Sequence, residues 1–386
     1  MKIIHIQVNR VHVPLKTAPV DPIHSKKDGY VPTEGLHKHI IQIHTDNGYT
    51  GIGETWKGTP DSAVISAAKH LLGQDPFAIP LMRLNLPHNP KAVNSRDLGE
   101  MVPVKPINHN PSIHAFEIAL ADIKGQSIGL TIAQLLGGPV RDSVLVHYWA
   151  PRLPPEKVGE IALEGQGLGF NGIKLKVTCD DPVVETVKTI GEKCGPDFRI
   201  TLDPNQRFCT IEKTLALGAA LSNYPIEVIE DPIPKTDFND YAQLRRSLSF
   251  PLALHLERPD EVIRAIKCEA ADVFNLRGTL WDVSRLGHLA EIANLRIWRG
   301  SGLDLGILDA SYTHVCAATP SCTLGSDIVG QFMREDDLIS ESLVYQNGHV
   351  MLPKGPGLGV TLDEDALTHF TVKNPKDEQP FLWNFD

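Results

Sequence analysis

The sequence predicts an α/β protein whose larger part is a modified (β/α)₈ barrel. The chain has 386 residues, so a large domain with a smaller partner is expected. From residue 144 short apolar runs recur, each followed by a helix-like stretch, and this alternation is typical of a barrel. A doubly wound sheet is the alternative, but no glycine-rich phosphate loop follows the first run. The eight predicted strands are 145–149, 172–177, 198–203, 226–230, 251–256, 272–277, 295–300 and 322–327.

The first third of the chain has a different, mixed pattern. Residues 1–14 and 37–45 alternate as strands, and an Asp-Asn-Gly turn leads from the second into 49–54, which predicts a hairpin. Helical patterns follow at 60–73 and 112–128. The polar loop 16–35 is long for a compact domain and is expected to be a lid or disordered.

Composition excludes several classes of function. A formal net charge of −10 argues against nucleic acid as a partner, because phosphate binding needs a basic face. The N-terminus lacks the apolar block of a signal peptide, and no apolar run is long enough to span a bilayer. The six cysteines have no metal-type spacing. These features predict a cytoplasmic protein with reduced thiols.

Charged side chains cluster where the predicted strands end. Lys174 and Lys176 close the second strand, Asp203 and Asn205 follow the third, and Glu230 ends the fourth. The carboxyl ends of barrel strands meet at one mouth, so these groups are expected to share a site suited to Mg²⁺. Taken singly, a Lys-x-Lys pair is usually solvated and a carboxylate after a strand is usually a helix cap. Their occurrence together on successive strands favours an active site.

These motifs resemble those of the enolase superfamily, in its mandelate racemase and muconate-lactonizing branch. The likeness includes 39–55 with its Gly-x-Gly-Glu ending, 116–144, GIKLKV, LDPNQ, IEDP and the closing 355–365. It implies an N-terminal α+β capping domain, a barrel, a C-terminal segment that returns to the cap, and a homo-oligomer. The three parts would span 1–127, 128–340 and 341–386.

The resemblance also implies a shared chemical step. A base removes the proton α to a substrate carboxylate, and Mg²⁺ stabilises the resulting enediolate. In the matching motif the second lysine is the base, so Lys176 takes that role, with Lys174 beside it. Asp203 and Glu230 match the first two metal ligands. The third ligand is an acid in the family, but here His255 stands at that position and Glu257 follows, so both remain candidates.

The second base of the family is missing. The aligned residue on the sixth strand is Arg277, which stays protonated near neutral pH, and the seventh strand holds no histidine. A single base favours dehydration of a hydroxy or sugar acid. A racemase, an epimerase or a cycloisomerase is the alternative within the superfamily. A catalytically inert binding relative is the alternative outside enzymes, while a nucleotide-binding enzyme has no motif to support it.

Several further residues are candidates for substrate binding. Asn205 and Arg277 would line the mouth, and Trp56 follows the Gly-x-Gly-Glu motif. Asp304 aligns with an acid that helps to bind or orient substrate in the family, although it could equally be a helix cap, as could Asp327. His24 lies in the predicted lid and could pair with a second acidic group of the substrate.

Overall fold

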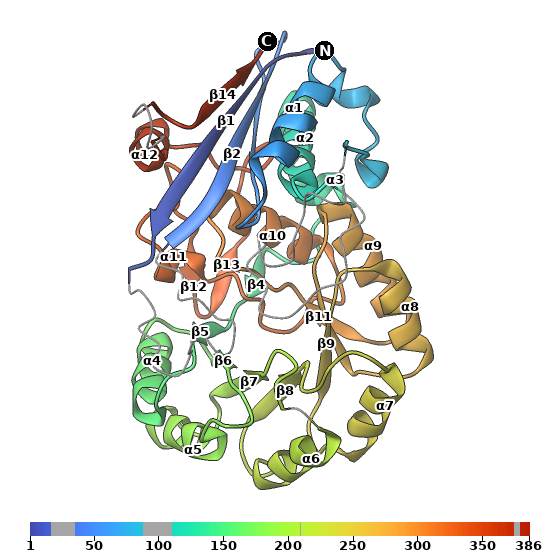
Figure 1. The fold of residues 1–386 in the computed structure, drawn as a ribbon, viewed down its shortest axis with the longest axis vertical. Coiled ribbons are helices and arrows are strands. Elements are labelled where there is room, and N and C mark those ends of the chain that lie inside the picture. Colours follow the sequence, from blue (N-terminus) through green and yellow to red (C-terminus); the bar gives the residue numbers. More distant parts are fainter. Residues whose placement is uncertain (17–34, 88–109, 209, 374–378) are drawn as a thin grey trace.

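The computed structural model describes residues 1–16, 35–87, 110–208, 210–373 and 379–386. An antiparallel sheet with helices beside it lies over one end of a ring of parallel strands and outer helices (Figure 1). The predicted fold class, a modified barrel with an α+β cap, is confirmed. None of the described helices is both long and apolar enough to cross a membrane.

The cap is built around a four-stranded sheet of order β14-β1-β2-β3. β1 and β2 pair along their whole lengths, from Ile3 opposite Thr45 to Pro14 opposite Gly35. The last strand of the chain pairs with β1, so the C-terminal segment completes the cap as predicted. Its elements are β1 (Ile3–Pro14), β2 (Gly35–Thr45), β3 (Thr50–Glu54), β14 (Leu382–Phe385), α1 (Asp61–Leu71), η2 (Pro76–Ala78), η3 (Leu81–Arg83), α2 (Ile113–Ile128), α3 (Ile132–Leu135) and α12 (Glu364–Phe370).

The barrel contains a seven-stranded parallel sheet in sequence order from β5 to β11, because each strand returns through a helix on the outside. Its strands are β5 (Tyr148–Ala150), β6 (Gly172–Lys176), β7 (Arg199–Asp203), β8 (Ile226–Glu230), β9 (Leu252–Leu256), β10 (Val273–Leu276) and β11 (Arg296–Trp298). Its helices are α4 (Pro155–Gly167), α5 (Val183–Cys194), α6 (Ile211–Ala220), α7 (Phe238–Ser247), α8 (Pro259–Lys267), α9 (Leu280–Ile292), α10 (Gly306–Ala318) and α11 (Gly330–Met333).

The eighth strand differs from the prediction. Residues 322–327 form only isolated parallel bridges, Cys322 with Ile297 on one side and Ser326 with Val146 on the other. These bridges still connect the two edges of the sheet and close the ring. The predicted first strand 145–149 is also split into β4 (Ser143–Leu145) and β5.

The start of the segment 341–386 pairs with the barrel part of the chain, and its end pairs with the cap. β12 (Tyr345–Gln346) and β13 (His349–Met351) form a hairpin, and β13 pairs with β4, which precedes β5 in the chain. An unpaired strand edge at β4 is thereby covered. In the part of the segment that the structure describes, α12 and β14 contact β1.

Two glycines explain how the cap packs on itself. A Cβ atom at Gly51 would lie 2.0 Å from the carbonyl oxygen of Ala119, and one at Gly53 would lie 2.0 Å from that of Ala115. Only glycine therefore lets α2 lie directly on β3. Glu54, at the end of the same strand, is thereby directed toward the barrel.

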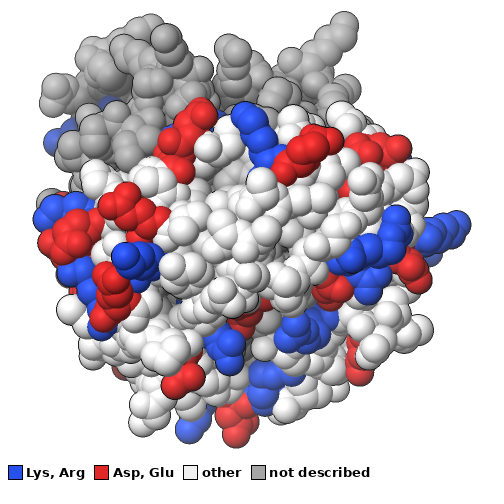
Figure 2. Space-filling model, turned by 90° about the horizontal axis from the view of Figure 1, so that it is seen from below, with Lys and Arg blue, Asp and Glu red and all other residues white. Residues whose placement is uncertain are grey.

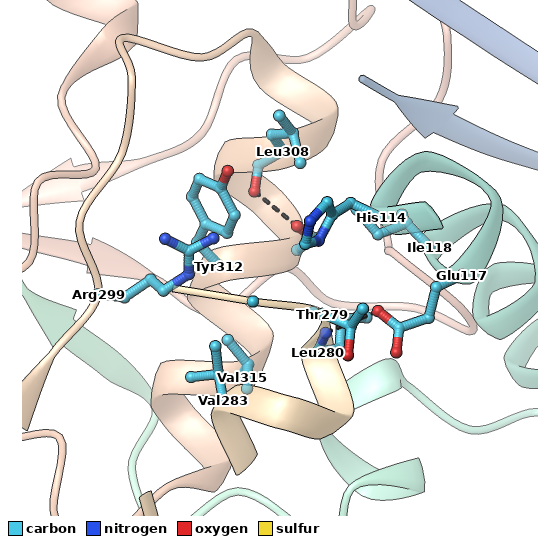
Figure 3. A pocket seen from close by; sticks show the side chains of 12 residues that line it. His114, Glu117, Ile118, Thr279, Leu280, Val283, Arg299, Leu308, Tyr312 and Val315 are labelled. Carbon is cyan, nitrogen blue, oxygen red and sulfur yellow. Dashed lines mark hydrogen bonds between the residues drawn. The ribbon is translucent and has the colours of Figure 1, made fainter. Parts of the chain in front are cut away.

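Helix α2 also contacts the barrel through a buried carboxylate. Glu117 accepts hydrogen bonds from the backbone N–H groups of Leu280 (2.6 Å) and Trp281 (3.4 Å), which begin α9. Beside it lies a cavity of about 10 Å³, the size of one water molecule, with Arg299 and Tyr312 on the opposite wall (Figure 3). Burial raises the pKa of Glu117 to about 8.

Replacing Glu117 by glutamine is expected to reduce the loss of stability between pH 5 and pH 8. An unfolded glutamate ionises near pH 4.3, but the folded one holds its proton up to about pH 8. The unfolded state therefore binds fewer protons across this window, so stability falls as the pH rises, by an amount on the order of a few kcal/mol. Urea unfolding of both proteins at pH 5 and pH 8 measures the difference. Equal pH slopes would contradict the assignment.

Candidate functional site

The two lysines of β6 lie at the mouth of the barrel among carboxylates. Lys174 Nζ lies 2.6 Å from Glu230 Oε2, 2.8 Å from Asp327 Oδ2 and 3.2 Å from Asp203 Oδ2. Lys176 Nζ donates to Asp203 Oδ2 at 2.5 Å and to Asn205 Oδ1 at 2.9 Å. Because residues two apart on a strand point the same way, both ammonium groups enter one site. The structure thus brings together the side chains predicted from neighbouring strand ends.

The pKa values of Asp203 and Glu230 shift in opposite directions at this site. Burial acts to raise the pKa of Asp203, but the ammonium groups of Lys176 and Lys174 outweigh it and hold that pKa well below its usual range. For Glu230 burial and the nearby Asp203 charge prevail and raise the pKa to about 8. A charge added near Glu230 must therefore be positive to keep this carboxylate ionised at neutral pH.

Both candidates for the third ligand lie near Glu230. His255 Nδ1 is 3.6 Å from Glu230 Oε1, and its Nε2 is 3.9 Å from Glu257 Oε1. Burial, with Lys235 and Arg277 nearby, lowers the pKa of His255 well below its usual value, so the imidazole is neutral. A neutral imidazole is the form that binds a metal.

The donor set fits a divalent cation. Among the described residues no three His, Cys, Asp or Glu side chains already converge at ligand distances, because the Lys174 ammonium lies between the carboxylates. His255 Nε2 is buried without a hydrogen-bond partner, whereas Glu230 Oε2 is ion-paired with that ammonium. Buried polar atoms of this kind need a partner. Carboxylate oxygens suit Mg²⁺, and one imidazole is compatible with it.

Arg277 and Trp56 bring the cap and the barrel together over the mouth. The Arg277 guanidinium lies 4.4 Å from the centre of the Trp56 ring, and its Nη1 is 3.4 Å from Glu257 Oε1. Trp56 also stacks on His114 of α2, with ring centres 3.6 Å apart. β10 lies four strands from β6 in the sheet, so the strand ends that carry Arg277 and Lys176 lie on opposite sides of the ring. Arg277 and Lys176 therefore lie where a substrate in the mouth could contact them.

Asp304 is placed differently from the other candidates. It is buried between the cap and the barrel, where Lys38 Nζ lies 2.5 Å from its Oδ1 and also 2.5 Å from Glu54 Oε1. Its Oδ2 accepts from the Tyr312 hydroxyl at 3.0 Å. These bonds occupy both oxygens, so Asp304 joins the two parts of the molecule; its predicted contact with substrate stays a prediction.

The family assignment follows from the comparison of this chain with known protein families. Residues 158–366 match the family model described as enolase C-terminal domain-like, which covers more than half of the chain. This chain belongs to the enolase superfamily. The match spans the strand ends that carry Lys174, Lys176, Asp203, Glu230 and His255, so the family and the site rest on the same residues.

Named relatives place it in the mandelate racemase and muconate-lactonizing branch of the enolase superfamily. The chain is 25% identical over 389 residues to the N-succinyl-L-Arg/Lys racemase of Bacillus cereus, covering 96% of this chain and 98% of that protein. It is 26% identical to the D-galactarolactone cycloisomerase of Agrobacterium fabrum, covering 87% and 92%. Muconate cycloisomerase 1 of Rhodococcus opacus is 28% identical, covering 67% and 71%. All three relatives are isomerases by name.

Solved structures of enolase-superfamily members share the fold. The crystal structure of the Bacillus cereus racemase superposes with a TM-score of 0.82 at 24% identity and covers both chains completely. An enolase from Thermobispora bispora, complexed with magnesium and formate, has a TM-score of 0.77 at 27% identity and covers 96% of this chain and 92% of that one. Magnesium is therefore found in members with this architecture.

Residues around the enolase-type site include some that the sequence did not single out. Asn275 Nδ2 donates to Glu230 Oε1 at 2.7 Å, and Lys38 holds Asp304. A polar residue inside an apolar strand was the available signal for Asn275, whereas Lys38 stands between two histidines and has no such signal. His24 lies outside the described residues.

Figure 2 shows one face of the molecule, seen from below. Acidic and basic side chains are interspersed around a largely uncharged centre on that face, without a continuous basic stripe among the residues described there. This charge pattern is compatible with the predicted absence of a nucleic-acid partner, which stays a prediction.

Proposed function

We propose that this chain catalyses a Mg²⁺-dependent reaction in which Lys176 removes the proton α to the carboxylate of a small-molecule substrate. The position of Lys176 carries the proposal. Its side chain is 22% exposed at the mouth, and its ammonium group is aligned by Asp203 and Asn205. In its neutral form an amine at this position can accept the α-proton of a substrate in the mouth.

The neighbouring side chains divide the remaining work. Asp203, Glu230 and His255 would hold the metal, with Glu257 as the alternative to His255. A bound Mg²⁺ supplies the positive charge that offsets the second negative charge created when the α-proton leaves. Lys174, whose pKa is raised well above its usual value because Asp327, Glu230 and Asp203 outweigh burial, is a permanent cation beside the substrate carboxylate.

The outcome of the reaction depends on the opposite side of the mouth. Arg277 lies on the opposite side of the ring from Lys176 and retains its proton, so it donates hydrogen bonds but does not remove a second proton. This arrangement favours β-elimination: Lys176 takes the α-proton, the C–O bond to the β-hydroxyl breaks, and Arg277 donates hydrogen bonds to the departing hydroxide, which takes a proton from solvent to become water. The products are water and an enol that becomes a 2-keto acid.

Isomerisation is the second candidate, because the named relatives are racemases and cycloisomerases. A cycloisomerase needs only one proton-transferring group on one face, so it is compatible with Lys176 alone. A racemase needs an acceptor on each face, and Arg277 argues against it.

Proton exchange in deuterated water tests these functions. The protein with Mg²⁺ is incubated with sugar acids, sugar lactones, N-succinyl amino acids and muconate, and each reaction is followed by proton NMR. Loss of the α-proton signal with formation of a 2-keto acid supports dehydration. A cyclised or ring-opened product, or inversion at the α-carbon, identifies an isomerase instead. Exchange with none of these carboxylates would contradict the proposal and favour an inert binding relative.

Mg²⁺ is expected to raise the melting temperature of the protein after treatment with a chelator. A ligand at 100 times its Kd stabilises the folded state by about 2.7 kcal/mol. Differential scanning fluorimetry with increasing Mg²⁺ measures the shift. The double variant Asp203→Asn, Glu230→Gln should lose the shift, whereas Asp260→Asn, an exposed acid paired with Arg258, should keep it. No shift in the parent protein would contradict the assigned metal site.

A further inference from the structure

Asp231 follows Glu230 and has an unusual backbone. Its φ of +43° lies in the left-handed region, where residues other than glycine are uncommon. Asn205 (φ 45°) and Gln206 (φ 68°) share this conformation at the end of the neighbouring strand. Non-glycine residues are held in this region only where surrounding bonds enforce it. Three such residues lie at neighbouring strand ends, so the bonds around them must enforce this backbone conformation.

Hydrogen bonds of Asp231 connect three neighbouring segments of the barrel. Its backbone N–H donates to the carbonyl of Ala253 at 3.1 Å, and its own carbonyl accepts from the N–H of Gln206 at 2.6 Å. Its side-chain Oδ1 accepts from the N–H of His255 at 3.0 Å. The residue is buried, so all these bonds are shielded from water. Asp231 thus connects the turn after β7 and the end of β8 with residues inside β9.

Lys235 completes the arrangement. Its Nζ lies 2.7 Å from Asp231 Oδ2 and donates to the carbonyl oxygen of His255, also at 2.7 Å. Both backbone polar groups of His255 are therefore bound by one ion pair, the N–H by Asp231 and the carbonyl by Lys235. These two bonds hold the backbone of β9 from which the His255 side chain projects.

We propose that Asp231, together with Lys235, is a positioning residue that holds Asp203, Glu230 and His255 in the relative placement needed to bind the divalent cation. The inference rests on the proposed function, since it assigns a role toward the same metal. Asp231 itself does not contact substrate. Partners behind metal ligands fix the direction of those ligands, and their loss weakens metal binding.

Two substitutions separate positioning from folding. Asp231→Gly removes both side-chain bonds, while glycine adopts a positive φ freely and keeps the backbone bonds to Gln206 and Ala253. Asp231→Asn keeps an acceptor for the His255 N–H, and asparagine tolerates the left-handed region better than most residues. Glu269→Gly is the matched control, because Glu269 is an exposed acid with a φ of +51° after α8.

Calorimetric titration with Mg²⁺ on the folded proteins measures the effect. Asp231→Gly is expected to weaken Mg²⁺ binding about 10- to 100-fold, and Asp231→Asn to recover most of that affinity. Glu269→Gly should bind Mg²⁺ like the parent protein. A purely structural role would lower the melting temperature in chelator and leave the Mg²⁺ affinity of the folded protein unchanged.

Two results would overturn the inference in different ways. Parent-like Mg²⁺ affinity in Asp231→Gly removes the positioning role and leaves the proposed function intact. Failure of the parent protein to bind Mg²⁺ removes the metal from the proposed function and the positioning role with it. The parent titration alone distinguishes these cases.

Discussion

Replacing Lys176 by methionine is expected to slow exchange of the substrate α-proton about 10²- to 10⁴-fold, the usual contribution of a positioned base. Methionine keeps a similar length but has no group that accepts a proton. Lys174 still lies 3.2 Å from Asp203 in this variant, so that carboxylate keeps a cation beside it. The exchange rate in deuterated water, measured on whichever carboxylate the parent protein turns over, reports the loss directly.

A second substitution separates the base from its charge. Lys176→Arg keeps a cation near Asp203 and Asn205, but arginine does not release its proton at neutral pH. If Lys176 is the base, both variants lose exchange while the Mg²⁺-induced rise in melting temperature remains. Lys188→Met, at a lysine whose side chain is 62% exposed on α5, is the control and should match the parent protein. Exchange by Lys176→Arg within about tenfold of the parent would show that charge alone suffices.

Replacing Lys38 by methionine should destabilise the folded protein by about 3–5 kcal/mol, because it leaves two buried carboxylates without their cation. The side chains of Lys38 and Glu54 are fully buried, and that of Asp304 is 2% exposed. Burial acts to lower the pKa of Lys38, but Asp304 and Glu54 outweigh it and raise that pKa, so the ammonium is charged in the fold. Urea unfolding gives the change in free energy.

The surface pair of Lys157 and Glu160 provides the comparison. Its side chains are 64% and 52% exposed, so Lys157→Met should leave the free energy of unfolding nearly unchanged. If Lys38→Met and Lys157→Met had the same free energy of unfolding, the buried ion pairs of Lys38 would not hold the cap on the barrel. A large loss only in Lys38→Met would show that this contact joins the two parts, because Lys38 and Glu54 belong to the cap and Asp304 to the barrel.

Much of the fold was predictable because it depends on local patterns. Apolar runs that alternate with helical stretches predicted β6 to β11, and the Asp-Asn-Gly turn predicted the hairpin of β2 and β3. The eighth strand was predicted as a full strand, but residues 322–327 make only isolated bridges. An apolar run does not indicate how many backbone hydrogen bonds its residues form. Pairing of β13 with β4 was missed for the same reason: strand partners far apart in sequence leave no local signal.

The candidate site divides in a similar way. The sequence alone determined which charged residues meet, because the ends of parallel strands share one edge, and this placed Lys174, Lys176, Asp203 and Glu230 together. Only the tertiary structure decided what surrounds them. The clamp of His255 by Asp231 and Lys235, and the burial of Asp304 against Lys38, join separate strand ends or the cap to the barrel. Such contacts depend on distances and desolvation between distant segments, which no residue pattern along the chain encodes.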